Sequence, residues 1–205
     1  MKLYFVCEKS LTESKGSNYF DSEGNELSLQ QAEYFRNSKV RDRNGNLMVA
    51  FKRTKSGLNS FNPGMLGEFF SDTPLNDSYF GKHIGRFYLN IERPLVVDAQ
   101  RNDWSYPLWL FLTDNSGNLV DRSELSDVVK NINIGIPKSV WEYIYDDDEE
   151  YEFDSLALLI KNHNLPYDGI ILKNITEGVG SGKQVVTDYV VLRKEQIEYI
   201  DGGKE

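Results

Sequence analysis

Cysteine and histidine are scarce in this sequence. A single cysteine, Cys7, occurs among 205 residues, so no intramolecular disulfide can form. Cys7 lies in the apolar run KLYFVC, which predicts a first strand with a buried, inert thiol rather than a nucleophile. Two histidines, His83 and His163, are too few for most histidine-rich metal sites, and they disfavour a Ser-His-Asp triad. We therefore expect no metal cofactor.

Positive charge and long apolar runs are also lacking. The formal net charge is -9, which argues against broad binding to nucleic acid or to an anionic membrane. It leaves room for a local basic pocket that binds a small phosphate ligand. No run approaches the roughly 18 apolar residues of a membrane span, and the N-terminus lacks the pattern of a signal peptide. We expect a cytoplasmic location.

The composition is that of an ordinary globular protein, with 40% hydrophobic and 13% aromatic residues. Short strands alternate irregularly with few helices, which favours an α+β fold over a sheet wound from βαβ units. We predict one domain over residues 1–205, with an insertion at about 101–155. Strands are predicted for LMVAFKR (47–53), EFFSD (68–72), RFYLNIE and PLVVDA as one strand interrupted at Pro94, YDGIILKN (167–174) and VVTDYVVLRKEQIEYI (185–200).

Two helices and one helical turn are expected. The segment LSLQQAEYFRNSKV (27–40) places Leu29, Ala32 and Phe35 on one helical face, with Ser28 as the N-cap. The other two segments are a helical turn in TPLNDSYF (73–80) and the helix SLALLIKNHN (155–164).

The glycine-rich stretch EGVGSGKQ (177–184) invites comparison with a phosphate-binding P-loop. Only three residues separate Gly178 from Gly182, and Gln184 stands where a serine or threonine must reach magnesium. The segment that follows predicts a strand and not a helix. The stretch is therefore predicted to be a mobile loop, which begins with Ile175 and Thr176 directly after the predicted strand 167–174.

Several motifs occur in the same order as in a known family. They are QAEYFRNSKVRDRNGNLMVAFKRT, SFNPGMLGEFFSDTP, FYLNIERPLVVDA, LPYDGIILKN and TDYVVLRKEQI, spread over residues 31–197. Together they resemble the ADP-ribosyltransferase fold, in particular the histidine-tyrosine-glutamate class found in polyvalent proteins of phages and mobile elements and in related toxins. The resemblance covers residues 105–155 poorly. It implies a split antiparallel β-sheet core with flanking helices, and NAD as the substrate.

The resemblance also implies roles for individual residues. Lys52 falls on the histidine that binds the adenosine ribose, and Arg53 on the glycine that holds the nicotinamide amide. Thr54 falls on the hydroxyl residue that follows. Phe69 falls on the tyrosine that stacks on nicotinamide, and Asp188 on the catalytic glutamate.

Two further aromatic and hydroxyl positions complete the implied NAD site. Tyr79 fits the aromatic residue that closes the other side of the nicotinamide ring. Arg53 also fits the arginine of the arginine-serine-glutamate class of this fold, with Ser71 as the candidate serine. The segment 178–187 matches the family's target-recognition loop.

All three positions of the family's triad are changed in this sequence. Phe69 keeps the stacking ring and loses only a hydroxyl. Asp188 keeps the charge but is one methylene shorter, and a displacement of about 1 Å can cost on the order of 100-fold in rate. Lys52 and Arg53 replace a neutral imidazole and a glycine, and these are the severe changes.

Two functions therefore stay open at the level of sequence. The first is a mono-ADP-ribosyltransferase that modifies a macromolecular target, with catalytic residues Lys52, Phe69 and Asp188. The second is a catalytically inactive relative that uses the same fold to bind a host defence protein or a nucleotide-derived signal. A third alternative takes FKRTK as a solvated basic strand end outside this fold.

Overall fold

The computed structural model describes residues 19–55, 63–76, 81–147, 150–178 and 182–202. The predicted strand around Cys7 lies outside these ranges, and so does Tyr79. Of the predicted helical turn at 73–80, only residues 73–76 are described, and they are not helical.

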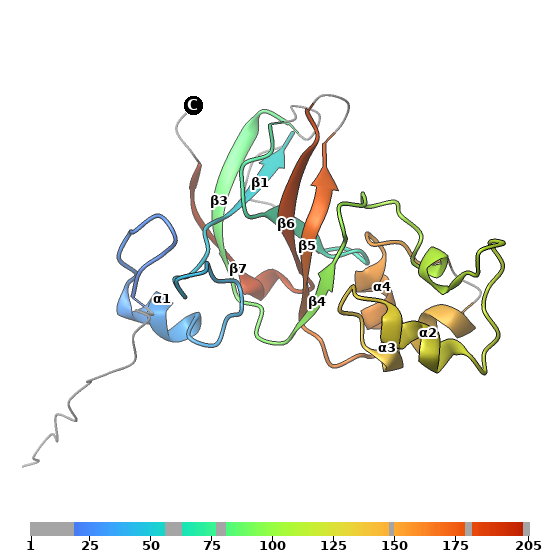
Figure 1. Cartoon of the computed structure of the whole chain (residues 1–205). Coiled ribbons are helices and arrows are strands. Elements are labelled where there is room, and N and C mark those ends of the chain that lie inside the picture. Colours follow the sequence, from blue (N-terminus) through green and yellow to red (C-terminus); the bar gives the residue numbers. More distant parts are fainter. Residues whose placement is uncertain (1–18, 56–62, 77–80, 148–149, 179–181, 203–205) are drawn as a thin grey trace, which may run out of the picture.

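A single mixed β-sheet organises the described residues (Figure 1). The strand order is β4-β5-β6-β2-β1-β3-β7, and all neighbours are antiparallel except β4 and β5, which are parallel. Together with the helices, this sheet confirms the predicted α+β class. The strands are β1 (Ala50–Thr54), β2 (Glu68–Ser71), β3 (His83–Leu89), β4 (Pro94–Asp98), β5 (Gly169–Glu177), β6 (Gln184–Val191) and β7 (Ile197–Gly202).

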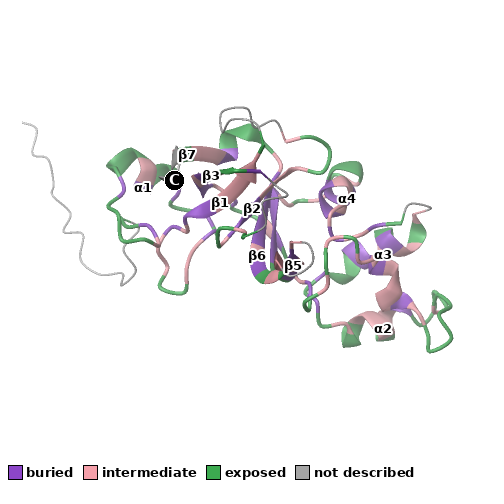
Figure 2. Cartoon of the chain, turned by 90° about the horizontal axis from the view of Figure 1, so that it is seen from above, coloured by how far each residue is buried: buried purple, intermediate pink, exposed green. Residues whose placement is uncertain are grey.

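A helical layer covers one face of the sheet. Parallel strands need a long crossover, and residues 99–168 between β4 and β5 supply it. The crossover contains the 3-10 helix η2 (Leu108–Leu112) and the α-helices α2 (Leu125–Asn131), α3 (Lys138–Asp146) and α4 (Leu156–Asn162). Figure 2 shows buried residues on β5 and β6 and on the helices that flank them. Trp141, Leu156 and Leu172 share one buried cluster, so the crossover and the sheet pack against a common core.

Helix α1 (Leu29–Tyr34) lies at the other end of the molecule (Figure 1). Ser28 caps it as predicted, because its hydroxyl accepts the N–H of Gln31 and the Gln31 side chain accepts the N–H of Ser28. Ala32 and Phe35 are buried, but Leu29 is 80% exposed. The prediction was wrong for Leu29, since a six-residue helix turns only a narrow stripe toward the core.

Two predicted strands are divided differently in the structure. RFYLNIE and PLVVDA form the separate strands β3 and β4, which lie at distant positions in the sheet. Pro94 opens the edge strand β4, where its missing N–H interrupts no ladder. The segment 185–200 forms β6 and β7, divided by the 3-10 helix η4 (Lys194–Gln196).

A β-bulge changes the second half of β5. The β5–β6 register shifts between Leu172 and Ile175, and Asn174 at this point has φ of 54°. After the bulge, Ile175 is fully buried and pairs with Val186, and the pairing with β6 continues to Glu177. The sequence predicted a loop for residues 175–177, and this was wrong because the buried Ile175 stabilises a strand among polar neighbours.

Candidate functional site

The sheet register brings several predicted site residues into one row. Phe51 pairs with Ser71, Ser71 with Asp188, and Asp188 with Leu172. Directly opposed residues share a face of the sheet, and side chains two positions apart do so as well. Phe69, Ser71, Asp188 and Leu172 therefore lie on the face covered by α2, α3 and α4, here called the helix face. Lys52 and Phe70 alternate with these positions toward the opposite face.

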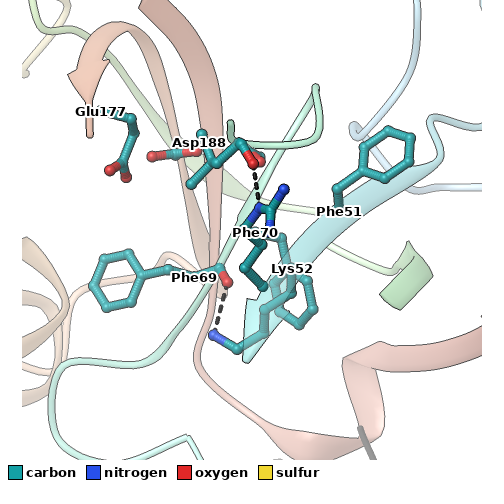
Figure 3. Close-up of a pocket in the computed structure, with 9 residues that line it drawn as sticks. Phe51, Lys52, Phe69, Phe70, Glu177 and Asp188 are labelled. Atoms are coloured by element: carbon teal, nitrogen blue, oxygen red, sulfur yellow. Dashed lines mark hydrogen bonds between the residues drawn. The ribbon is translucent and has the colours of Figure 1, made fainter. Parts of the chain in front are cut away.

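A small pocket of about 80 Å³ lies at this row (Figure 3). Its lining combines five of the predicted site residues with four that the sequence did not single out. The predicted ones are Lys52, Arg53, Phe69, Ser71 and Asp188, and the others are Phe51, Phe70, Leu75 and Glu177. Thr54, the last residue of β1, is not part of the lining.

Asp188 and Glu177 form a buried pair of carboxyl groups. Asp188 is 2% exposed and Glu177 is 7% exposed. Burial, followed by a side-chain hydrogen bond and the charge of Glu177, raises the pKa of Asp188 well above its ordinary value. The negative charge of Asp72 raises the pKa of Asp188 further. The positive charge of Lys52 lowers this pKa, but its effect is the smallest of these. Burial beside Glu177 thus favours the protonated, neutral form of Asp188.

The hydrogen bonds around this pair are unequal. The indole N–H of Trp104 donates to Glu177, and the Trp104 ring meets Phe69 edge-on with ring centroids 4.7 Å apart. Asp188 Oδ2 is buried and has no hydrogen-bond partner among the described residues. Trp104 of the crossover therefore anchors Glu177, whereas one buried oxygen of Asp188 has no such partner among the described residues.

Lys52 directs its charge along β2. Its amine donates to the carbonyl of Phe69 at 3.0 Å and forms an ion pair with Glu68 at 2.7 Å. The amine also lies 5.4 Å from the centre of the Phe70 ring. In Figure 3 the Lys52 side chain extends toward the Phe69 carbonyl oxygen and away from Asp188. The Lys52 amine, which the resemblance assigns to NAD binding, is therefore already bound to groups of β2.

Arg53 and Ser71 hold the chain that follows β2. The Arg53 guanidinium donates to the carbonyl oxygens of Leu75 and Gly81, the second at 3.1 Å. The Ser71 hydroxyl donates to the carbonyl of Thr73 at 2.6 Å. A Cβ at Gly81 would lie 2.1 Å from the carbonyl of Thr54, so only glycine fits this close approach. Both predicted NAD contacts thus serve the local backbone.

The sequence did not predict Glu177 as a site residue, because the bulge in β5 decides which face of the sheet Glu177 lies on. A shift of one residue turns every later side chain to the other face of the sheet. Glu177 pairs with Gln184, which lies on the helix face because it is four residues from Asp188. Without the bulge, Glu177 would point away from Asp188. Asn174, a residue type that adopts positive φ readily, was the signal in the sequence.

Neither a cluster of metal-ligating side chains nor a membrane-spanning helix occurs among the described residues. Within the described ranges, no group of three or more His, Cys, Asp or Glu side chains is arranged to hold a metal ion. In the same part of the chain, no helix has the length and apolar character needed to cross a membrane.

Comparisons with known proteins give little guidance. No family model matches the chain, and no curated protein matches it. A crystal structure of an anti-CRISPR protein matches 75% of this chain and 95% of its own, with 14% identity and a TM-score of 0.34. At this TM-score the likeness carries no argument about fold or function. The resemblance to ADP-ribosyltransferases stays a prediction.

Proposed function

We propose that this protein is a binding protein with an ADP-ribosyltransferase-like core and no transferase activity. It would act in the cytoplasm of a bacterial or phage-infected cell, on a protein target. The observation that carries the proposal is the burial of Asp188, the residue that the resemblance assigns to the catalytic glutamate. Burial raises its pKa well above the ordinary aspartate value, and protonation of Asp188 would remove the negative charge that stabilises the cationic ribose formed when nicotinamide leaves.

The remaining pocket supports the same conclusion. Ligand sites commonly enclose about 300–1,000 Å³. The pocket beside Asp188 encloses about 80 Å³, far less than a dinucleotide needs. Lys52 and Arg53 are engaged by Glu68 and by backbone carbonyls, so binding NAD would first have to break these contacts. Among the described residues, these contacts favour a closed site over one that is open to NAD.

One observation favours the transferase as a second candidate. Residues assigned to the NAD site from separate strands, Arg53, Phe69 and Asp188, do line one pocket. A transferase would need this pocket to widen and Asp188 to ionise on binding NAD. Both changes would have to be driven by the binding energy of the dinucleotide.

The test is a pair of NAD measurements on the full chain. We expect no incorporation of label from radiolabelled NAD into proteins of a bacterial lysate. In calorimetric titrations with NAD, we expect the wild type and Phe69→Ala to give the same heat of binding. Labelled protein that appears with the wild type but disappears with Asp188→Ala would contradict the proposal. NAD binding that is lost in Phe69→Ala would contradict it as well, because Phe69 is the ring assigned to nicotinamide.

A further inference from the structure

A second, much larger pocket lies on the opposite face of the sheet from Asp188. It encloses about 770 Å³, which is within the range of small-molecule sites. Twelve residues line it: Lys39, Arg41, Asp42, Arg43, Met48, Asp72, Pro94, Val96, Ile171, Lys173, Thr187 and Tyr189. None of these residues lines the pocket beside Asp188. We call this space the opposite-face pocket.

The floor of the opposite-face pocket is largely apolar. Val96, Ile171 and Tyr189 are consecutive partners across β4, β5 and β6, so their side chains lie side by side on one face. Met48 adds a flexible apolar side chain from the segment before β1. Val96 remains 39% exposed, so the floor presents apolar surface to a ligand. Such a floor suits a flat ring or another apolar body.

The two carboxylates at this pocket are satisfied by nearby protein groups. Asp42 Oδ1 accepts the backbone N–H groups of Asn44 and Asn46 at 2.8 and 2.9 Å. Asp72 Oδ1 accepts the N–H of Thr187 at 3.1 Å and the hydroxyl of Thr73 at 2.8 Å. Neither forms an ion pair with a lysine or arginine of the described chain.

Four cationic side chains line the pocket, and one of them, Arg41, is held by hydrogen bonds to the backbone. Arg41 donates to the carbonyls of Ser38, Gly45 and Phe35 and so fixes the local turn. The side chains of Lys39, Arg43 and Lys173 are exposed and make no hydrogen bond or ion pair with another described residue. A chain of net charge -9 thus gathers three uncommitted cations around one pocket. Such a local field attracts an anion.

We propose that the opposite-face pocket binds a small phosphorylated molecule with an aromatic or apolar body, that is, a ligand of the nucleotide type. The apolar floor takes the body, and Lys39, Arg43 and Lys173 take the phosphate charge. Phosphate offers several charged oxygens to cations that approach from different sides, which suits cations from two separate segments. The proposal stands apart from the absence of transferase activity, because the two pockets are on different faces of the sheet.

The test uses ADP as the probe, with adenosine and inorganic phosphate as comparison ligands, in calorimetric titrations of the full chain. We expect ADP to bind at sub-millimolar concentration, and both comparison ligands to bind at least about tenfold more weakly. Lys173→Glu should weaken ADP binding at least about tenfold, since it replaces a charge-assisted contact by repulsion. The matched control is Lys130→Glu on α2, an exposed lysine in the helical layer, which should leave ADP binding unchanged.

Several results would overturn the proposal. They are the absence of ADP binding, equal affinity in wild type and Lys173→Glu, or phosphate alone binding as tightly as ADP. If Lys173→Glu unfolds, the double variant Lys39→Ala, Arg43→Ala provides the same comparison at exposed positions.

NAD distinguishes this proposal from the preceding one, because it also carries phosphates and rings. NAD binding that is lost in Lys173→Glu and kept in Phe69→Ala supports the opposite-face pocket. The reverse pattern would contradict the lack of a transferase site and would place NAD on the helix face.

Discussion

Replacing Trp141 with alanine is expected to lower the free energy of unfolding by about 3–5 kcal/mol. Trp141 lies on α3, is fully buried, and shares a core cluster with Leu95 and Leu172 from the sheet. Removing its side chain leaves a cavity between the helical layer and the sheet, so both parts should lose stability together. Urea unfolding, followed by far-ultraviolet circular dichroism and by fluorescence of the remaining tryptophans, measures this loss.

The control for this prediction is Leu29→Ala on α1. Leu29 is also a large apolar residue, but it is 80% exposed, and its removal should change stability by less than about 0.5 kcal/mol. We expect the wild type, Trp141→Ala and Leu29→Ala each to unfold in urea in one cooperative transition. Two separate transitions, with only one of them shifted by Trp141→Ala, would show that residues 101–155 are an independently folding insertion.

Replacing Asp188 with asparagine is expected to raise the free energy of unfolding at pH 7 by about 1–3 kcal/mol. Asparagine has nearly the shape of a protonated aspartate and offers an N–H donor toward Glu177. It removes the need to protonate an acid, or to bury an anion, when the chain folds. The gain corresponds to a rise in melting temperature of roughly 2–10 °C, which calorimetry resolves.

The pH dependence gives this prediction a second, signed readout. The pKa of Asp188 is higher in the folded chain than in the unfolded chain, so the folded state holds the proton more tightly. Stability therefore falls as pH rises from about 4, the ordinary aspartate pKa, through the raised pKa of the folded state. The advantage of Asp188→Asn should grow over this window and vanish in acid.

Asp127→Asn is the matched control for Asp188→Asn. Asp127 is an exposed aspartate on α2, paired with Lys130, and its neutralisation should leave the melting temperature nearly unchanged. If Asp188→Asn were as neutral as this control at every pH, Asp188 would not be a buried protonated acid.

Much of the sheet was predictable from the sequence, because its strands are short, apolar and bounded by turn residues. Strands β1, β2, β5 and β6 begin within three residues of the predicted positions, and the Ser28 cap of α1 is as expected. The pairing of β4 with β5 was not predictable, because it joins segments separated by the crossover. Within the crossover, the sequence predicted the helix at 155–164, which the structure confirms as α4, but it gave no prediction for η2, α2 and α3.

The candidate site was predicted only in part, for a similar reason. The resemblance identified Phe69 and Asp188, which line one pocket, but Glu177 became visible only through the β5 bulge. The opposite-face pocket joins Lys39, Arg43 and Lys173, and Lys173 is separated from the others by about 130 residues of sequence. The composition was compatible with a local basic pocket, but only the folded sheet shows which cationic residues lie together.

The ionisation state of Asp188 at pH 7 is the most direct test of the proposed function. A carbon-13 NMR titration of the aspartate side-chain carboxyls, with Asp188→Asn used to assign the resonance, measures it. We predict a resonance of a protonated carboxyl at pH 7 that titrates only well above the ordinary aspartate range. A carboxylate that is already ionised at pH 7, with a pKa near about 4, would contradict the account and restore Asp188 as a catalytic anion.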